Sequence, residues 1–549
     1  MTAAEMSRRR LVLVTVGVML ALLLAALDQT IVGTAMPRII ADLNGFDKYA
    51  WVTTAYLVTS TVTVPIAGKL GDLFGRKPFV LVGMAGFMVF SWACGFSQDM
   101  NQLIVFRAVQ GLFGGVLFAS VFTLLADIFP PKTRARMQGV FGGVFGLASV
   151  IGPAAGGFIT DNWGWRWVFY VNIPVGVLGM ALLVAFLPYV RSKASWRDID
   201  FAGAFLMIAG LVPIMISLSN TSTYGWTSWQ TLVPLVGGVL LLVAFVVVEH
   251  FEREPIVPLS LFKNRAFTVS VIVGMLSGFG MFGAIIFTPL VFQGVLGVSA
   301  TNSGTLITPM MIGLIGASIL SGQLMVRIKN YKWLGTIGSA VMAIGVYILT
   351  LVTTHSTQLQ VTSALIIVGA GLGITFPLYL NAVQSAVDRK FLGVVSSNMQ
   401  FFRNVGGTLA TAIFGSILAN RLGPNIQAQL DKLNLPPQFK SNFKLPSGAG
   451  GAQQIFNAAN LARERASLPA PFRPFFDQAI GAVKEGLATT MHEVFLIALI
   501  FVLITTVATV FMPSVPLLAA RRQPGTELGE ASPVPEPTPE PEPAAVSSE

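Results

Sequence analysis

The feature that most constrains this chain is a succession of apolar stretches, each long enough to cross a membrane as a helix. A spanning helix needs about 20 predominantly apolar residues, and we count fourteen such stretches. Strands of alternating apolar and polar residues, which mark a membrane barrel, are absent from the sequence. The stretches therefore predict an all-α polytopic membrane protein. Their approximate limits are 11–36, 48–69, 78–96, 101–126, 137–160, 166–188, 199–220, 231–249, 266–293, 302–326, 333–352, 358–383, 397–420 and 490–513.

Composition excludes several other classes of protein. Of the 549 residues, 54% are hydrophobic and 11% are charged, whereas soluble domains carry about 25% charged residues. One cysteine and three scattered histidines argue against a disulfide framework and against a metal cluster. No phosphate-binding loop of the form Gly-x-x-x-x-Gly-Lys-Ser/Thr occurs, which argues against an ATP-driven pump. We therefore expect no enzyme activity, no metal and no cofactor.

The positive charge of the chain follows its expected topology. With a cytoplasmic N-terminus, 22 Lys and Arg residues fall in cytoplasmic segments and 3 fall in short outer loops. Cytoplasmic loops of membrane proteins carry such an excess, so the net charge of +10 needs no nucleic-acid partner. No cleavable signal peptide is apparent, because the first apolar run is too long for a signal-peptide core. We expect a multi-pass protein of the cytoplasmic (inner or plasma) membrane, with both termini in the cytoplasm.

Two segments fall outside the pattern of spans. Residues 521–549 are rich in Pro and Glu and are predicted to be disordered. Residues 421–489 form an unusually long outer loop, and long structureless loops are uncommon, so we expect partial helix there. The loop is either a tether or an element that contacts a partner or lipid at the outer face.

Two opposite charges lie within predicted spans at similar depth. Asp28 lies about 12 Å from the outer end of the first span, and Arg107 lies about 9 Å from the outer end of the fourth. Charged residues inside spans are rare and mark functional sites by default. The pair can share a water-lined cavity, either as a static ion pair or as a titrating acid tuned by burial and by the arginine.

Arg107 also begins a helical face that continues through Gln110, Gly111 and Gly114. The glycines permit close helix approach or leave room for a ligand. Arg403 lies about two turns from the cytoplasmic end of its predicted span. It either extends its charge to the interface or contributes to substrate binding or gating.

Glycine is concentrated in two further segments. The fifth span carries Gly142, Gly146, Gly152, Pro153, Gly156 and Gly157. This run predicts close packing against another helix and a kink at the proline. The loop after the second span carries Gly68, Asp72, Gly75, Arg76 and Lys77, which predicts a tight turn and a charged latch. Asp127, at the cytoplasmic end of the fourth span, is a candidate partner for Arg76.

Together these motifs resemble those of the major facilitator superfamily, and within it those of the fourteen-helix drug:proton antiporters. The similarity covers all predicted spans but not the Pro-rich tail. Gly33 replaces a frequent Asn, Leu73 replaces a frequent basic residue, and the 421–489 loop looks longer than usual. The segments that carry the resemblance are Gly68–Pro78, Arg107–Gly111, Gly152–Gly157, Leu27–Pro37, Trp163–Pro174 and Phe402–Gly407.

The resemblance implies two six-helix bundles, at residues 1–190 and 266–520, with two inserted helices at 191–265 between them. Substrate would bind near the midplane while the bundles rock around it. Asp72, Arg76 and Asp127 would latch the cytoplasmic side, and the glycine-rich fifth span would act as hinge and seal. Arg107 would tune the protonation of Asp28.

The function expected on this basis is proton-driven export of small lipophilic compounds, with the proton gradient as the energy source. Export of a lipid or envelope component through the long outer loop is a second hypothesis, and a non-transporting receptor or scaffold is a third. We expect a monomer that contacts the lipid bilayer and, through residues 421–489, an outer-face partner. The sequence does not name the substrate.

Overall fold

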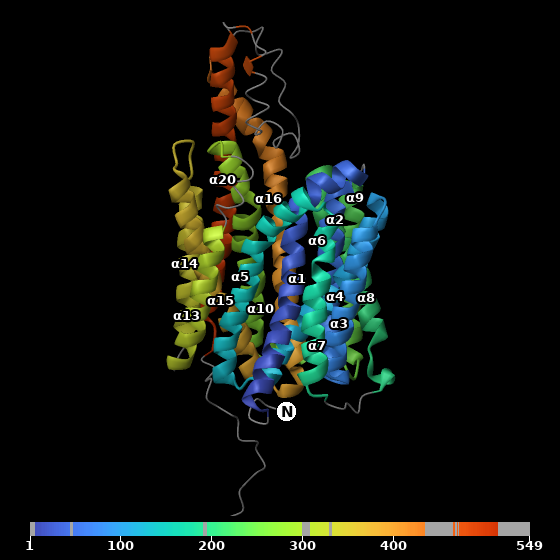
Figure 1. Cartoon of the computed structure of the whole chain (residues 1–549). Coiled ribbons are helices and arrows are strands. Elements are labelled where there is room, and N and C mark those ends of the chain that lie inside the picture. The colour runs from blue at the N-terminus through green and yellow to red at the C-terminus, as the bar shows by residue number, and fades with distance from the viewer. Residues whose placement is uncertain are drawn as a thin grey trace, which may run out of the picture.

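The computed structural model describes residues 6–43, 48–189, 195–298, 308–328, 332–433, 465–466, 469 and 472–513. Within these ranges the chain forms helices and no strands, and long helices run up and down between two ends of one bundle (Figure 1). We call the end at which α1 begins the lower end and the end at which α1 finishes the upper end. The predicted tail at 521–549 lies outside the described residues, as does about half of the predicted loop at 421–489.

The first seven helices pack against one another as an N-terminal half. Helix α2 packs against α4, α3 against α4, and α1 against both α5 and α7. The span predicted at 166–188 is divided into a single helical turn, α6, and a longer helix, α7. The bounds are α1 (Arg8–Leu43), α2 (Tyr49–Phe74), α3 (Arg76–Phe96), α4 (Met100–Ile128), α5 (Pro131–Asn162), α6 (Trp167–Tyr170) and α7 (Asn172–Phe186).

Two long helices separate this half from the rest of the chain. They are α8 (Phe201–Tyr224) and α9 (Trp229–Phe251), preceded by the short helix η3 (Trp196–Asp198) and followed by η4 (Leu259–Lys263). Helices α8 and α9 pack on each other, and α8 also contacts α2 and α16. The inserted pair therefore lies beside the seam between the two halves.

The remaining helices form a C-terminal half. Helix α15 packs against α13 and α14, and α16 packs against α10 and α20. After α10 the backbone widens into two π-helical segments, η5 and η6. The bounds are α10 (Arg265–Phe282), η5 (Gly283–Phe287), α11 (Thr288–Leu290), η6 (Val291–Val295), α13 (Thr308–Arg327), α14 (Lys332–Thr350), α15 (Gln358–Ala386), η7 (Arg389–Phe391), α16 (Leu392–Asp431) and α20 (Arg473–Val510).

Twelve helices of the described chain are long and apolar enough to cross a membrane, so the predicted number of fourteen is not confirmed. The two long helices outside that set are α2 and α16, which carry polar side chains such as Lys69 and Asp72 in α2 and Arg403 in α16. These two helices pack against each other across the seam. Protein therefore covers part of the surface that lipid would otherwise contact, which permits their polar composition.

The halves are joined tightly toward the lower end. Helix α5 packs against α13, and α16 packs against α2 and α4. A Cβ at Gly139 of α5 would come within 2.5 Å of the Ser318 carbonyl oxygen of α13, and one at Gly322 of α13 would come equally close to the Ala135 carbonyl oxygen of α5. Glycine is therefore required on both sides of this contact, because only its lack of a Cβ allows the two backbones to approach.

Helices α16 and α20 are longer than a membrane requires and project beyond the other helices at the upper end (Figure 1). With 40 and 38 residues, they are about 60 and 57 Å long, against a hydrocarbon core of about 30 Å. Their projecting parts pack together through Ile426 and Leu430 of α16 and Phe476 and Val483 of α20. The predicted outer loop is thus helical at both of its ends, as expected.

Candidate functional site

Asp28 and Arg107 form a buried ion pair between α1 and α4. The Arg107 Nη1 donates to Asp28 Oδ2 at 2.6 Å, and the two side chains are 2% (Arg107) and 0% (Asp28) exposed. Arg107 also stacks its guanidinium on the ring of Tyr56 in α2, at 4.3 Å from the ring centroid. The predicted pairing is present, but the carboxylate is enclosed by side chains rather than facing a cavity.

Two amides complete the coordination of the Asp28 carboxylate. Gln110 Nε2 and Asn172 Nδ2 each donate to Asp28 Oδ1 at 3.0 Å, and Gln110 Oε1 accepts from Arg107 at 2.8 Å. Asn172 is itself anchored to Ser91 of α3 at 3.0 Å. One carboxylate thus gathers donors from α4 and α7, and any movement among these helices changes its surroundings.

Gly111 and Gly114 serve the packing of α4 against α2 rather than a ligand. A Cβ at Gly111 would lie 2.5 Å from the Tyr56 carbonyl oxygen, and one at Gly114 would lie 2.6 Å from the Tyr56 hydroxyl. Because these contacts bring Tyr56 close to α4, its ring can cover Arg107. The predicted helical face is therefore correct, and its glycines are explained by close helix approach.

At the lower end, Arg76 joins the two acids predicted as its partners. Its Nε donates to Asp127 Oδ2 of α4 at 2.9 Å, and its Nη2 donates to Asp72 Oδ1 of α2. Asp72 also accepts the backbone N–H groups of Gly393 at 3.0 Å and Val394 at 2.8 Å. These two residues lie in the first turn of α16, so the carboxylate lies at a helix N-terminus, where negative charge is favoured. The predicted latch therefore reaches across the seam to the C-terminal half.

The glycines and the lysine of this segment also have structural roles. Gly68 faces α16, where a Cβ would lie 2.8 Å from the Gly393 carbonyl oxygen. Gly75 joins α2 to α3 with φ of 95°, a conformation that favours glycine. Lys77 Nζ donates to the carbonyl oxygens of Val184 at 2.8 Å and Leu187 at 2.6 Å, at the C-terminal end of α7. The segment fixes three neighbouring helices at once.

The glycine-rich run of α5 faces two different helices. Gly142 and Gly146 face α13 of the C-terminal half, whereas Gly152 and Gly156 face α1. A Cβ at Gly157 would meet nothing within 4 Å, so packing does not explain that residue. Helix α5 continues past Pro153 as one helix. This run therefore connects the helix of Asp28 to the opposite half.

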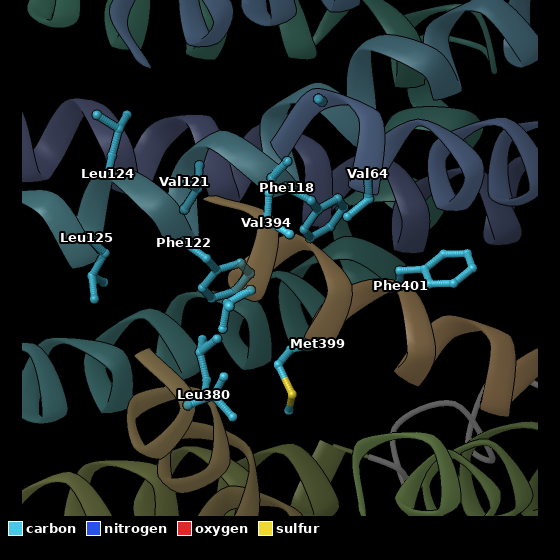
Figure 2. Close-up of a cluster of buried hydrophobic side chains, with 14 of the residues drawn as sticks. Val64, Phe118, Val121, Phe122, Leu124, Leu125, Leu380, Val394, Met399 and Phe401 are labelled. Carbon is cyan, nitrogen blue, oxygen red and sulfur yellow. The ribbon is translucent and has the colours of Figure 1, made fainter. Parts of the chain in front are cut away.

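A cavity of about 90 Å³ lies between the halves, with walls from α4, α5, α10, α13, α15 and α16. Five phenylalanines line it: Phe118, Phe122, Phe141, Phe145 and Phe376. Figure 2 shows Phe118 and Phe122 of α4 on one side of the seam and Leu380 and Met399 on the other. Below it, Gln138 of α5 donates to Gln384 of α15 at 2.9 Å and closes the lower side.

Arg403 lines this cavity from α16. Helix α16 begins at Leu392, five residues before the predicted span. Arg403 therefore lies about three turns, or about 16 Å, above the lower end of the helix, rather than the predicted two turns. Its guanidinium packs over the ring of Phe376 at 4.0 Å from the centroid. The side chain therefore packs within the bundle instead of extending toward the lower end.

A second, polar pocket of about 590 Å³ lies at the lower end between the inserted helices and the latch segment. There Lys69 of α2 pairs with Glu254 at 2.6 Å, and the Glu249 carboxylate accepts the backbone N–H of Ile256 at 3.1 Å. Asp200 caps α8 by accepting the N–H of Gly203 at 2.6 Å, and burial raises the pKa of its carboxyl above the usual value. The Lys69–Glu254 pair ties the segment after α9 to α2, and the other two contacts order the ends of the inserted helices.

Several functional contacts were not found by sequence reasoning. The role of Asn172 was missed because a polar residue two positions before a proline indicates a turn more readily than it indicates a ligand for a carboxylate. The contact of Asp72 with α16 was missed because it spans more than 300 positions of sequence. The five cavity phenylalanines carried no signal, since they are among 40 in the chain.

The fold and site define a polytopic membrane transporter with two helical halves around a central cavity. The family model of the Major Facilitator Superfamily matches residues 18–411, and the chain belongs to that superfamily. The resemblance seen in the sequence motifs is therefore confirmed at the level of the superfamily.

Two relatives and one solved structure are similar to this chain over most of its length. The chain is 40% identical over 517 residues to the multidrug transporter protein MdtP of Bacillus subtilis, covering 93% of this chain and 94% of that protein. It is 36% identical over 516 residues to multidrug resistance protein 3 of the same organism, covering 93% and 96%. The crystal structure of the human organic anion transporter MFSD10 (TETRAN) matches with a TM-score of 0.53 at 13% identity, covering 91% of this chain and all of that one. The last comparison supports the fold alone.

Proposed function

We propose that this protein exports small lipophilic compounds from the cytoplasm by alternating access, in exchange for protons. The relatives named as multidrug transporter and multidrug resistance protein support drug export. The observation that carries proton coupling is the Asp28 carboxylate, a buried acid of the N-terminal half that is held by Arg107 and Gln110 of α4 and Asn172 of α7. Proton entry down the membrane potential contributes about 2.3 kcal/mol per charge per 100 mV.

The two ends of the bundle have separate tasks in this mechanism. The lower end faces the cytoplasm, and its contacts close the cavity on that side through Asp72 and the Gln138–Gln384 hydrogen bond. Binding of a proton to Asp28 removes the charge that holds Arg107, which weakens the packing of α1 against α4. Because α5 packs against both α1 and α13, this change is passed to the seam between the halves.

Proteoliposomes with a pH gradient test this proposal. The probes are anilinonaphthalene sulfonate, phenylnaphthylamine and ethidium, and an entrapped pH dye reports proton movement. We expect probe-dependent proton flux in the wild type and its loss in Asp28→Asn. Asp42→Asn is the matched control, since Asp42 also lies on α1 and pairs with an arginine, Arg166, at 2.8 Å, but is half exposed. Equal flux in Asp28→Asn and the wild type would remove Asp28 from the coupling step.

The projecting parts of α16 and α20 favour a second candidate, delivery of a lipid-like cargo beyond the outer membrane surface. Their length past the membrane is about 25–30 Å. Gly486 of α20 faces Ile426 of α16, where a Cβ would meet its Cα at 2.6 Å, so a short linker can replace residues 430–485. This deletion should spare dye export and stop lipid delivery; unchanged lipid delivery would reject the second candidate.

A further inference from the structure

The described wall of the central cavity carries one positive charge and no acid. Among the described residues that line it, Arg403 is the single charged side chain, and none is an Asp or Glu. Asp28 is not part of this wall, because it is enclosed between α1 and α4 with Arg107. The Asp28–Arg107 pair and Arg403 therefore lie at separate sites, and the described wall of the cavity is cationic.

Arg403 is partly buried and lacks, among the described residues, the ion-pair partner that an arginine inside a helical bundle normally has. Within the part of the chain that the structure describes, it makes no ion pair, and its Nε is buried without a hydrogen-bond partner. Its Nη2 donates to Gln400 Oε1, and its guanidinium face lies on Phe376. An arginine carries five N–H donors, and a charge withdrawn from water is costly unless it is paired. The site is thus incomplete without an acceptor.

We propose that the cavity binds amphipathic compounds with an aromatic body and one anionic group, such as a carboxylate or sulfonate. The anionic group pairs with Arg403, and the body packs against the phenylalanines of the seam. This inference rests on the proposed export function and names the class of its cargo. A cationic compound would meet a charge of the same sign, with no carboxylate in the wall to offset it.

The arrangement of the arginine favours an oxyanion over a neutral polar group. The guanidinium is a planar fork that matches two oxygens of one acid group. Phe376 of α15 and Gln400 of α16 hold this fork in place. All three residues belong to the C-terminal half, so the fork stays assembled when the halves separate. Separation is needed, because ligand sites usually measure about 300–1,000 Å³ and this cavity measures about 90 Å³.

A matched pair of probes tests the proposal at equilibrium. Anilinonaphthalene sulfonate and phenylnaphthylamine share the same aromatic body and differ in the sulfonate. Binding of each is measured to the full-length protein in nanodiscs without a pH gradient, after subtraction of empty nanodiscs. The variants are Arg403→Gln, Arg403→Lys and the control Arg421→Gln, which removes one positive charge from the same helix at an exposed position.

We expect the wild type and Arg421→Gln to bind the sulfonate more tightly than the neutral probe. Arg403→Gln should weaken sulfonate binding by about 10- to 100-fold, the range for one charge-assisted hydrogen-bonded contact, and change binding of the neutral probe by less than about threefold. Retained binding of the neutral probe shows that the variant is folded. If Arg403→Gln does not fold, Arg403→Lys serves in its place, with a smaller loss of the preference because the charge remains and the fork is lost.

The proposal is overturned if the wild type shows no preference for the sulfonate, or if the preference persists unchanged in the folded Arg403 variant. These results leave the proposed export function standing if probes still drive proton flux in proteoliposomes. Conversely, an Arg403-dependent preference without any gradient-driven flux would reject proton-coupled export and leave the anion site in place.

Discussion

Neutralising Asp72 tests whether the lower end is held closed by this one carboxylate. In Asp72→Asn the side chain keeps one oxygen acceptor but loses its charge, while the closed state contains two backbone donors from α16 at 3.0 and 2.8 Å. Hydrogen bonds to charged groups contribute about 1.5–3 kcal/mol, and a charge at a helix N-terminus adds about 0.3–1 kcal/mol. We estimate a net loss of about 2–3 kcal/mol from the closed state, which corresponds to about a 30- to 150-fold shift toward an open lower end.

Spin-label distances across the seam measure this shift. Labels at Thr133→Cys of α5 and Ile328→Cys after α13 lie at exposed positions on opposite halves, in a Cys94→Ser background. Asp72→Asn should move the population to longer distances, and Glu252→Gln, which neutralises an exposed acid of the lower end, should not. An unchanged distance distribution in Asp72→Asn would refute the reasoning that this carboxylate couples the two halves.

Two further substitutions test the packing around Asp28, with thermal unfolding in detergent as the measurement. Gly152→Ala should destabilise the folded protein by about 1–3 kcal/mol, because its Cβ would meet the Thr30 Cβ of α1 at 2.8 Å. The control Gly157→Ala should not destabilise it, because a Cβ there would meet nothing within 4 Å. Equal losses in the two variants would contradict the assigned faces of α5. Asn172→Ala removes a donor to Asp28 and should cost about 1–3 kcal/mol. The control Asn162→Ala removes an exposed bond within α5 and should cost less; a larger loss in the control would argue against the carboxylate network.

Sequence reasoning succeeded where a single residue or a short segment carries the physical signal. A carboxylate and a guanidinium inside apolar stretches are too costly to leave unpaired, so the sequence alone was enough to pair Asp28 with Arg107. Arg76 and Asp127 were matched because both were placed at the cytoplasmic ends of neighbouring predicted spans, and the structure shows their ion pair. Sequence reasoning failed for the depth of Arg403, because α16 begins at Leu392, five positions before the predicted boundary.

A bundle of membrane-spanning helices could be predicted from the amino-acid sequence, because apolar length and the need to satisfy backbone hydrogen bonds in lipid leave a helix as the solution. Which helices pack across the seam emerges from the folded chain alone. Asp72 reaches the start of α16, and Arg403 faces a cavity whose described lining holds no acid, because packing brings together segments that are hundreds of residues apart. Packing between distant segments decides which charged side chains line the cavity, and no local sequence pattern shows which ones these are.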